Sequence, residues 1–188
     1  KSGKIRHCRR VNSVKKEIYT AIMYNYFSFV QKKSSKKRDI LQVDHENIKY
    51  IPFRKNFYSE TSEISKMSNE EVRAYRKSMD NMKIRGLKCP RPIKNWYQCG
   101  LTSKILEVIA EQKYERPTSI QAQAIPVIMS GRDLIGIAKT GSGKTMAFVL
   151  PMLRHVMDQP RLSINDGPIA LIMTPTRELA MQTYSECC

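Results

Sequence analysis

One eight-residue stretch constrains the fold of this chain more than any other part of its sequence. It reads Ala138-Lys139-Thr140-Gly141-Ser142-Gly143-Lys144-Thr145. This matches G/A-x-x-x-x-G-K-[ST], the pattern of a loop that binds nucleotide phosphates. The glycines at 141 and 143 can close a tight loop, and their small size lets backbone N–H groups surround an anion. In such a loop Lys144 reaches the β- and γ-phosphates, and the Thr145 hydroxyl holds Mg²⁺.

The residues on both sides of this loop have the pattern that a phosphate loop requires. Asp133-Leu134-Ile135-Gly136-Ile137 is a short apolar run typical of a buried strand. After the loop, apolar residues form a broad helical face: Met146, Phe148, Val149, Leu150, Met152, Leu153, Val156 and Met157. The start of this helix would add its positive dipole end to the phosphates. The alternative is a chance Gly-Ser-Gly turn before Lys-Thr, and the agreement of the flanks disfavours it.

The charge of the chain favours polyanionic partners. The 188 residues carry a net charge of +16, and residues 1–50 hold 13 Lys and Arg against 4 Asp and Glu. Such a basic chain attracts nucleic acid or an anionic membrane through steering and counterion release. A solvated basic tail is the alternative for residues 1–50.

Neither a membrane span nor an oxidising compartment is predicted. The apolar run 18–30 is too short to cross a bilayer, and no small-residue cleavage site follows it, so we expect no membrane partner. The five cysteines are odd in number and form no C-x-x-C pair, which favours reduced thiols in the cytosol or nucleus.

The N-terminal part reads as a tail followed by an extension. The chain begins with Lys1 rather than Met, so we expect a fragment, with residues 1–37 as a basic, disordered tail. Within that tail, residues 18–30 could form a short buried helix or strand. In the extension, 38–93, Ser68 and Glu71 form a capping box for a helix that runs to about Met79. Residues 48–58 mix aromatic and basic side chains; docking on the chain's own domain is favoured over stacking on bases.

Further helices and a second strand are expected before the C-terminus. A helix opening at 101–103 should bury Leu101, Ile105, Val108 and Ile109. Thr118 should cap another, with Ile120, Ala124 and Ile125 inward, and Pro126 should kink it or start a new turn. The apolar run 169–173 should lie parallel to 133–137 through a right-handed crossover. Thr176 can cap a helix that starts at Arg177.

Three motifs in fixed order resemble those of DEAD-box RNA helicases. Residues 114–121, Tyr-Glu-Arg-Pro-Thr-Ser-Ile-Gln, followed by Ala124-Ile125-Pro126, resemble the Q motif, with Trp96 as the isolated upstream aromatic. Residues 138–145 resemble motif I, and Pro175-Thr176-Arg177-Glu178-Leu179-Ala180 resembles motif Ia. The resemblance implies an α/β fold. It would be a partial RecA-like P-loop NTPase lobe, a parallel sheet with flanking helices, preceded by a basic, largely irregular N-terminal extension. The Q-motif region would cover 94–122 and the ATP-binding domain would start at 123–188.

The resemblance also implies roles for single residues. Gln121 would read the adenine edge and select ATP over GTP, and Tyr114 would stack near the base with support from Trp96. Residues 138–145 would bind ATP, with Lys144 and Thr145 as catalytic groups and Thr145 holding Mg²⁺ through ATP. Pro175, Thr176 and Arg177 would contact the RNA backbone, which carries little sequence information. The structural alternatives are a surface polar residue at 121 and a solvated charge at 177.

Two residues depart from the family's pattern. Lys113 stands where Gly is usual, and Ser119 where Pro is common. Both are loop or cap positions, and neither removes a group to which a role is given.

The extension is similar to that of nuclear DEAD-box helicases of pre-mRNA splicing that act in branch-site recognition and prespliceosome assembly. The similarity rests on 43–45, 52–58, 89–93 and 96–100. It implies an RNA-stimulated ATPase in the nucleus, with RNA and spliceosomal proteins as partners. No Asp-Glu-Ala-Asp follows Ala180, so we expect the fragment itself to hydrolyse ATP poorly. The alternatives are a non-enzymatic RNA-binding splicing scaffold and another P-loop NTPase, against which Gln121 and Arg177 argue.

Overall fold

The computed structural model describes residues 44–50, 52–163 and 166–187. The predictions for the tail at 1–37 lie outside these ranges. The chain divides into two compact units, Phe53–Gln159 and the pair of segments Lys1–Pro52 and Pro160–Cys188. Each unit is described by itself.

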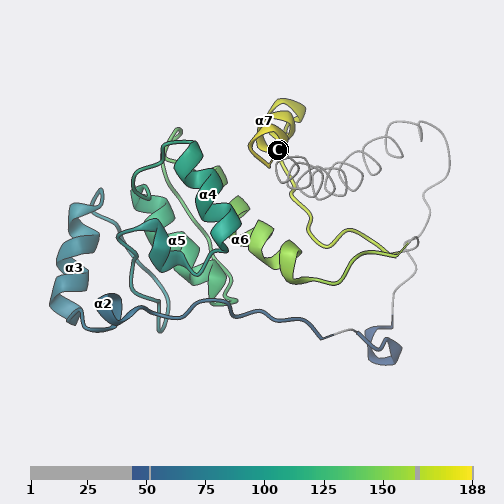
Figure 1. Cartoon of the computed structure of the whole chain (residues 1–188), viewed down its shortest axis with the longest axis horizontal. Helices are drawn as coiled ribbons and strands as arrows, with labels where there is room; N and C mark the ends of the chain where they lie inside the picture. Colours follow the sequence, from purple (N-terminus) through teal and green to yellow (C-terminus); the bar gives the residue numbers. More distant parts are fainter. Residues whose placement is uncertain (1–43, 51, 164–165, 188) are drawn as a thin grey trace, which may run out of the picture. The chain divides into compact units, whose positions relative to one another are not determined.

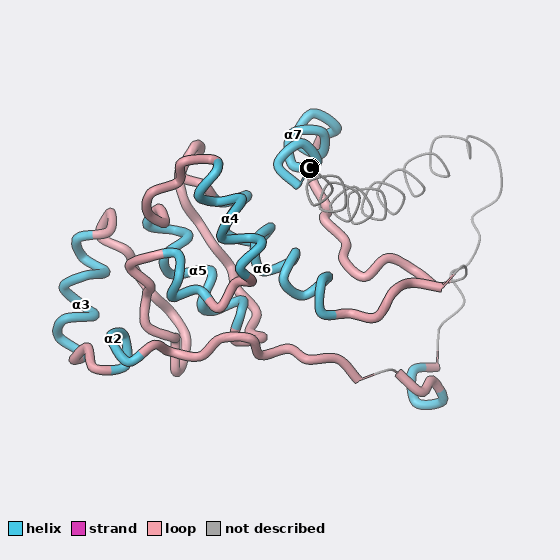
Figure 2. The backbone as a smooth tube through the Cα atoms, in the orientation of Figure 1, coloured by secondary structure: helices cyan, strands magenta, loops and turns pink. Residues whose placement is uncertain are grey.

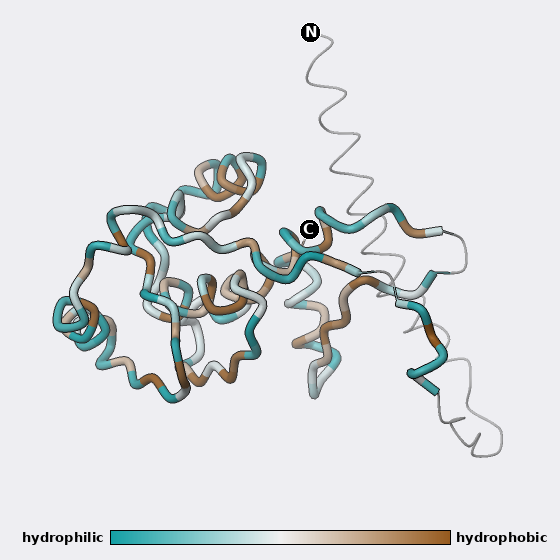
Figure 3. The backbone as a smooth tube through the Cα atoms, turned by 90° about the horizontal axis from the view of Figure 1, so that it is seen from below, coloured by the Kyte–Doolittle hydropathy of each residue, from teal (hydrophilic) through white to brown (hydrophobic). Residues whose placement is uncertain are grey.

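The first unit, Phe53–Gln159, is built from helices and the loops between them (Figures 1 and 2). Its elements are α2 (Ser62–Ser65), α3 (Asn69–Ser78), the 3-10 helix η2 (Trp96–Cys99), α4 (Ser103–Glu111), α5 (Ser119–Met129) and α6 (Lys144–Asp158). Hydrophobic and hydrophilic residues alternate along the helical coils, as expected for helices with one buried face (Figure 3).

Helix α5 lies at the centre of this unit and packs against α6. Residues 121–127 and Met129 of α5 are all buried. The surrounding core includes Ile64, Ile93, Trp96 and Leu150. Because α5 carries the Q motif and α6 starts at the phosphate loop, this packing connects the two motifs.

The predicted capping box of α3 forms, and Thr118 caps α5 as predicted. At α3, Glu71 N–H donates to Ser68 Oγ (3.2 Å) and Ser68 N–H donates to the Glu71 carboxylate (2.7 Å). The helix ends at Ser78 with Met79 as its cap, as predicted. Thr118 and Gln121 form the same reciprocal arrangement at α5, and Pro126 lies inside that helix, which continues to Met129.

Some predicted helix faces need correction. Ile105 and Ile109 of α4 are buried, but Val108 is 54% exposed. In α6, Val149 and Leu150 are buried, whereas Phe148 and Met157 are 37% and 41% exposed. The predicted apolar stripes were therefore too wide, because the core covers a narrower arc of each helix.

Docking of the basic aromatic segment is confirmed at Phe57. The N–H groups of Phe57 and Tyr58 both donate to the Met129 carbonyl, at 2.7 and 3.1 Å. The buried Phe57 ring meets the guanidinium groups of Arg54 and Arg154 at 4.8 and 4.3 Å from its centroid. Phe53 remains 56% exposed.

No residue within the described ranges is assigned to a β-strand. Residues 133–137 and 169–173 are predicted as apolar strands, but the structure assigns them as loops, with all side chains exposed in 133–137 and with residues 170 and 172 half-buried in the second run. Ile135 is 92% exposed and Met173 is 84% exposed. A strand needs a neighbouring backbone to pair its N–H and C=O groups, and neither segment forms such a ladder among the described residues. The parallel sheet stays a prediction.

The second unit contributes η1 (His45–Asn47) and α7 (Arg177–Cys187). Helix α7 begins where predicted, and the Leu179 N–H donates to Thr176 Oγ1 at 3.3 Å. In neither unit does a described helix combine the length and apolar content needed to cross a bilayer.

Candidate functional site

The phosphate-loop residues 138–145 form a tight turn that leads directly into α6. Gly141 and Gly143 have φ angles of +74° and +85°, in the left-handed region that glycine tolerates. Gly143 is the N-cap residue, so α6 begins at Lys144. The free N–H groups of a helix start and a positive dipole end therefore coincide with this turn.

The side chain of Lys144 folds back onto the phosphate loop itself. Lys144 Nζ donates to the carbonyls of Ala138 and Lys139, both at 2.6 Å. Ser142 Oγ is a buried oxygen without a hydrogen-bond partner, and a Cβ atom on Gly141 would meet no atom within 4 Å apart from its chain neighbours. A cation, an unpaired hydroxyl and an uncovered glycine turn at a helix start fit the phosphates of a nucleotide. Thr145 is half-buried in the first turn of α6.

Residues of the Q motif at the start of α5 make hydrogen bonds to the phosphate loop. Gln121 Oε1 accepts from the Thr118 N–H (2.9 Å), and Gln121 Nε2 donates to the Gly143 carbonyl (3.1 Å). Thr118 Oγ1 donates to the Ser142 carbonyl at 2.8 Å. Gln121 is only 6% exposed. The structure thus brings Gln121 against the phosphate loop, which makes a simple surface role for it wrong.

Gly143 has a second reason to be glycine. A Cβ atom on it would lie 2.5 Å from Gln121 Nε2 and 3.1 Å from Thr118 Oγ1. The first distance is shorter than real Cβ contacts and the second is tighter than most, so the absence of a side chain at 143 lets Gln121 approach the loop as it does here.

Trp96 and Tyr114 are also connected. The buried Trp96 ring donates from Nε1 to the Tyr114 carbonyl at 2.8 Å, while Tyr114 itself is 46% exposed. Lys113, just before Tyr114, has φ of +59°. This left-handed angle gives a physical reason for glycine at this position in the family.

Pro175, Thr176 and Arg177 lie at the start of α7, in the other unit, and all three are exposed. Their expected RNA contact stays a prediction.

Among the described residues, Cys99 and His155 are two ionisable groups outside this site with shifted pKa values. Burial raises the pKa of the Cys99 thiol to about 12, so the nucleophilic thiolate is absent at neutral pH. Burial also lowers the pKa of His155, with the neighbouring Arg154 charge acting in the same direction. No group of three or more His, Cys, Asp or Glu residues gathers in the described part of the chain.

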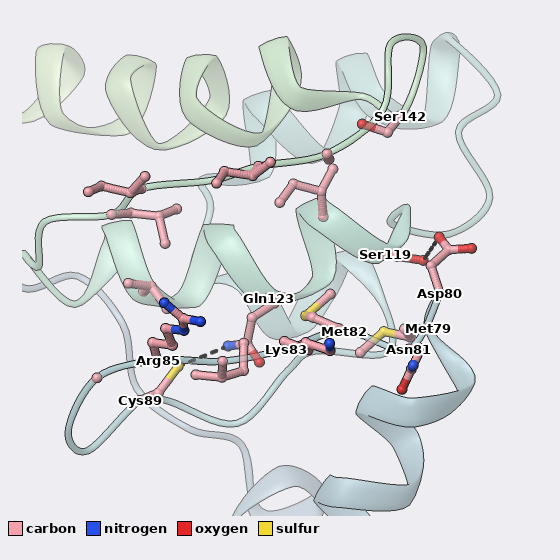
Figure 4. A pocket seen from close by; sticks show the side chains of 18 of the residues that line it. Met79, Asp80, Asn81, Met82, Lys83, Arg85, Cys89, Ser119, Gln123 and Ser142 are labelled. Atoms are coloured by element: carbon pink, nitrogen blue, oxygen red, sulfur yellow. Dashed lines mark hydrogen bonds between the residues drawn. The ribbon is translucent and has the colours of Figure 1, made fainter.

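Sequence reasoning missed the polar residues that join α3 and the following loop to α5. Arg76, Asp80, Ser119 and Gln123 make hydrogen bonds there. Asp80, Ser119 and Gln123 also line a groove of about 1360 Å³ (Figure 4). Their partners lie far apart in the sequence, so no local pattern marks them.

Comparison with known proteins agrees with the motifs. Residues 118–188 match the family model described as DEAD/DEAH box helicase. The human "Probable ATP-dependent RNA helicase DDX46" is 60% identical over 154 residues, which is 81% of this chain and 15% of that protein. The Schizosaccharomyces pombe "Pre-mRNA-processing ATP-dependent RNA helicase prp11" is 57% identical over 155 residues, 82% of this chain and 15% of that protein.

The chain is also similar to solved structures of RNA helicases. The ADP-bound RNA helicase Prp28 of Chaetomium thermophilum aligns with a TM-score of 0.60 at 41% identity, over 69% of this chain and 31% of that one. The yeast DEAD-box splicing factor Prp28 aligns with a TM-score of 0.62 at 34% identity, over 66% and 29%. The chain spans about 15% of the length of the curated relatives named here. From its motifs, their geometry and these similarities, the chain belongs to the DEAD-box helicase family.

Proposed function

We propose that this chain contributes the nucleotide-binding part of an ATP-dependent RNA helicase that acts in pre-mRNA splicing in the nucleus. The observation that carries the proposal is the direct contact between Gln121 and the phosphate loop, through the Gly143 carbonyl. The relatives' names, which describe ATP-dependent RNA helicases and pre-mRNA processing, support the same function.

ATP and Mg²⁺ are the proposed ligands. Backbone N–H groups of the loop 138–145 and the Lys144 ammonium hold the phosphates, and the Thr145 hydroxyl holds Mg²⁺. Gln121 reads the adenine edge, and Tyr114, on the loop anchored by Trp96, stacks near the base. When bound, Mg²⁺ would supply positive charge to offset the charge that develops on the phosphates in phosphoryl transfer.

RNA is the proposed partner of the second unit. The exposed residues 175–177 at the start of α7 offer a helix N-terminus and the Arg177 guanidinium to a phosphate backbone. Local separation of short RNA duplexes or remodelling of RNA–protein complexes follows from coupling such contacts to ATP binding. Spliceosomal proteins are the proposed further partners.

The sheet belongs to the same proposal. The apolar, exposed runs 133–137 and 169–173 are the proposed parallel strands of a RecA-like lobe, whose exposed edges would pair with further strands.

The test is titration of the chain with fluorescent Mg-ATP and Mg-GTP. We expect ATP-selective binding that Lys144→Ala weakens through loss of the phosphate contact and Gln121→Ala weakens through loss of adenine recognition. Circular dichroism confirms that each variant folds. A folded chain that ignores ATP, or binds GTP as tightly, would contradict the proposal.

A non-enzymatic RNA-binding scaffold is the second candidate. It is favoured by the exposed Phe53 ring, which has the Lys55 ammonium 5.5 Å from its centroid, a combination that suits a stacked base and its phosphate. RNA binding that is indifferent to ATP and to Lys144→Ala would support it instead.

A further inference from the structure

A group of hydrogen bonds joins helix α5 to the extension. We call this group the α3–α5 contact. It consists of Arg76 on α3, Asp80 in the following turn and the Pro90 carbonyl, together with Ser119 and Gln123 of α5. Figure 4 shows the Asp80–Ser119 and Cys89–Gln123 interactions from close by. All these residues belong to the unit Phe53–Gln159.

Gln123 is the centre of this contact. Its side chain is 3% exposed, and both ends of its amide are paired. Oε1 accepts from Arg76 Nε at 2.9 Å, and Nε2 donates to the Pro90 carbonyl at 2.9 Å. Arg76 Nη2 donates to the same carbonyl at 3.1 Å, which closes a triangle. Loss of Arg76 would leave the buried Gln123 oxygen unpaired, which is costly in a protein interior.

Two further bonds fix the start of α5. Ser119 Oγ donates to Asp80 Oδ2 at 2.9 Å, and the Ile93 N–H donates to the Ala122 carbonyl at 2.9 Å. Asp80 reaches Ser119 from a left-handed turn, with φ of +53°, that follows α3. Asp and Asn tolerate such angles better than most residues.

These anchors surround Gln121 in the sequence. Residues 119, 122 and 123 are bonded to the extension, while Thr118 and Gln121 are bonded to the phosphate loop. The first turns of α5 therefore lie between two sets of hydrogen bonds, one on each side. A shift of this backbone by a fraction of an ångström would change the length and angle of the hydrogen bond from Gln121 Nε2 to the Gly143 carbonyl, and so its strength.

We propose that Arg76 and Gln123 are positioning residues of the nucleotide site, and that the extension sets the affinity and adenine selectivity of Gln121 through the α3–α5 contact. This inference rests on the proposed function, in which Gln121 reads the nucleotide. Segment 69–93 is then a structural part of the ATP site.

The experiment measures the dissociation constants of Mg-ATP and Mg-GTP for this chain and its variants. We expect Arg76→Ala to weaken ATP binding about 5- to 10-fold, the loss of one to two positioning hydrogen bonds. GTP binding should change less, so the ATP-to-GTP selectivity falls. Arg73→Ala is the matched control, because Arg73 lies on the same helix with an exposed side chain, and it should bind as the unsubstituted chain does.

A double-mutant cycle with Gln121 distinguishes a positioning role of Arg76 from a general loss of structure. In a Gln121→Ala background, Arg76→Ala should have no further effect on ATP binding, because the group that it positions is gone. Ser119→Ala offers a milder, partly exposed change that should weaken ATP binding in the same direction if Arg76→Ala does not fold.

Three results are decisive. Unchanged ATP affinity and selectivity in folded Arg76→Ala or, where that variant does not fold, in Ser119→Ala would overturn this inference alone. An equal loss for ATP and GTP that persists in the Gln121→Ala background would also overturn it. Absence of ATP binding by the unsubstituted chain would refute the proposed function, and this inference with it.

Discussion

At the scale of single residues, Gly143 satisfies two separate demands. Its φ of +85° suits glycine, and its missing side chain leaves room for Gln121 Nε2, which a Cβ would approach to 2.5 Å. Gly141 has a similar φ of +74°, but no atom lies within 4 Å of its would-be Cβ. A side chain at 141 would therefore cause backbone strain alone, whereas a side chain at 143 would cause both strain and a clash with Gln121.

We expect Gly141→Ala and Gly143→Ala to lower the free energy of unfolding by about 1 kcal/mol or more each, because alanine is strained at positive φ. Only Gly143→Ala should also displace Gln121 and reduce selectivity for ATP over GTP. Chemical denaturation gives the stability and nucleotide titration gives the selectivity. Equal selectivity in both variants would contradict the assigned clash.

Lys113 is a non-glycine residue whose backbone has the left-handed conformation that favours glycine. Its φ is +59°. We expect Lys113→Gly to raise the free energy of unfolding by about 1 kcal/mol, since a left-handed angle costs a non-glycine residue roughly that much. Glu107→Gly, at an exposed position inside α4, should lower it by about 1 kcal/mol. Urea denaturation compares the two, and a destabilised Lys113→Gly would show that the angle is not strained.

At the scale of elements, capping boxes decide where helices begin. The sequence pattern predicted the capping box of α3 and the Thr118 cap of α5, and the structure adds Gln121 as the reciprocal partner of Thr118. Such signals are readable because every partner lies within one turn. Hydrogen bonds to the backbone and hydroxyl of Ser68 lower the pKa of Glu71, so the charged carboxylate is favoured in the folded chain.

We expect Ser68→Ala to lower the free energy of unfolding by about 1 kcal/mol, through loss of the N-cap. Ser59→Ala, at an exposed loop position, is the control and should have little effect.

Because the pKa of Glu71 is depressed in the folded chain, the contribution of its carboxylate to stability is present above the usual carboxyl pKa and is lost as pH falls through the folded pKa. Denaturation from neutral to acidic pH should therefore show Glu71→Gln approaching the unsubstituted chain at low pH. A difference that grows with acidity would contradict this assignment.

At the scale of the whole molecule, apolar residues fall into two groups. Ile93 is fully buried in the core around α5, while Ile135 is 92% exposed. Ile93 lies between Pro92 and Lys94 in the sequence, whereas Ile135 lies in the apolar run 134–137. Local hydropathy therefore does not predict which of the two is buried. The proposed sheet predicts that Ile135 becomes buried when its segment is paired.

We expect Ile93→Ala to lower the free energy of unfolding by about 2–5 kcal/mol and Ile135→Ala by less than about 0.5 kcal/mol in this chain. In a chain extended with the corresponding helicase sequence of a relative, Ile135→Ala should cost more than about 2 kcal/mol. Calorimetry or denaturant titration measures each pair. A neutral Ile135→Ala in the extended chain would argue against a buried strand at 133–137.

The sequence by itself determined the features that depend on neighbouring residues. It predicted the phosphate loop at 138–145, the caps at Ser68, Thr118 and Thr176, and the family, because each rests on short spacing and backbone chemistry. Tertiary structure alone decided the long-range pairs. Gln123 meets Arg76 across 47 positions of the chain, and Gln121 bonds to Gly143 because α5 packs against α6. It also decided that 133–137 stays exposed here, since a strand forms only against a neighbour and no local pattern supplies one.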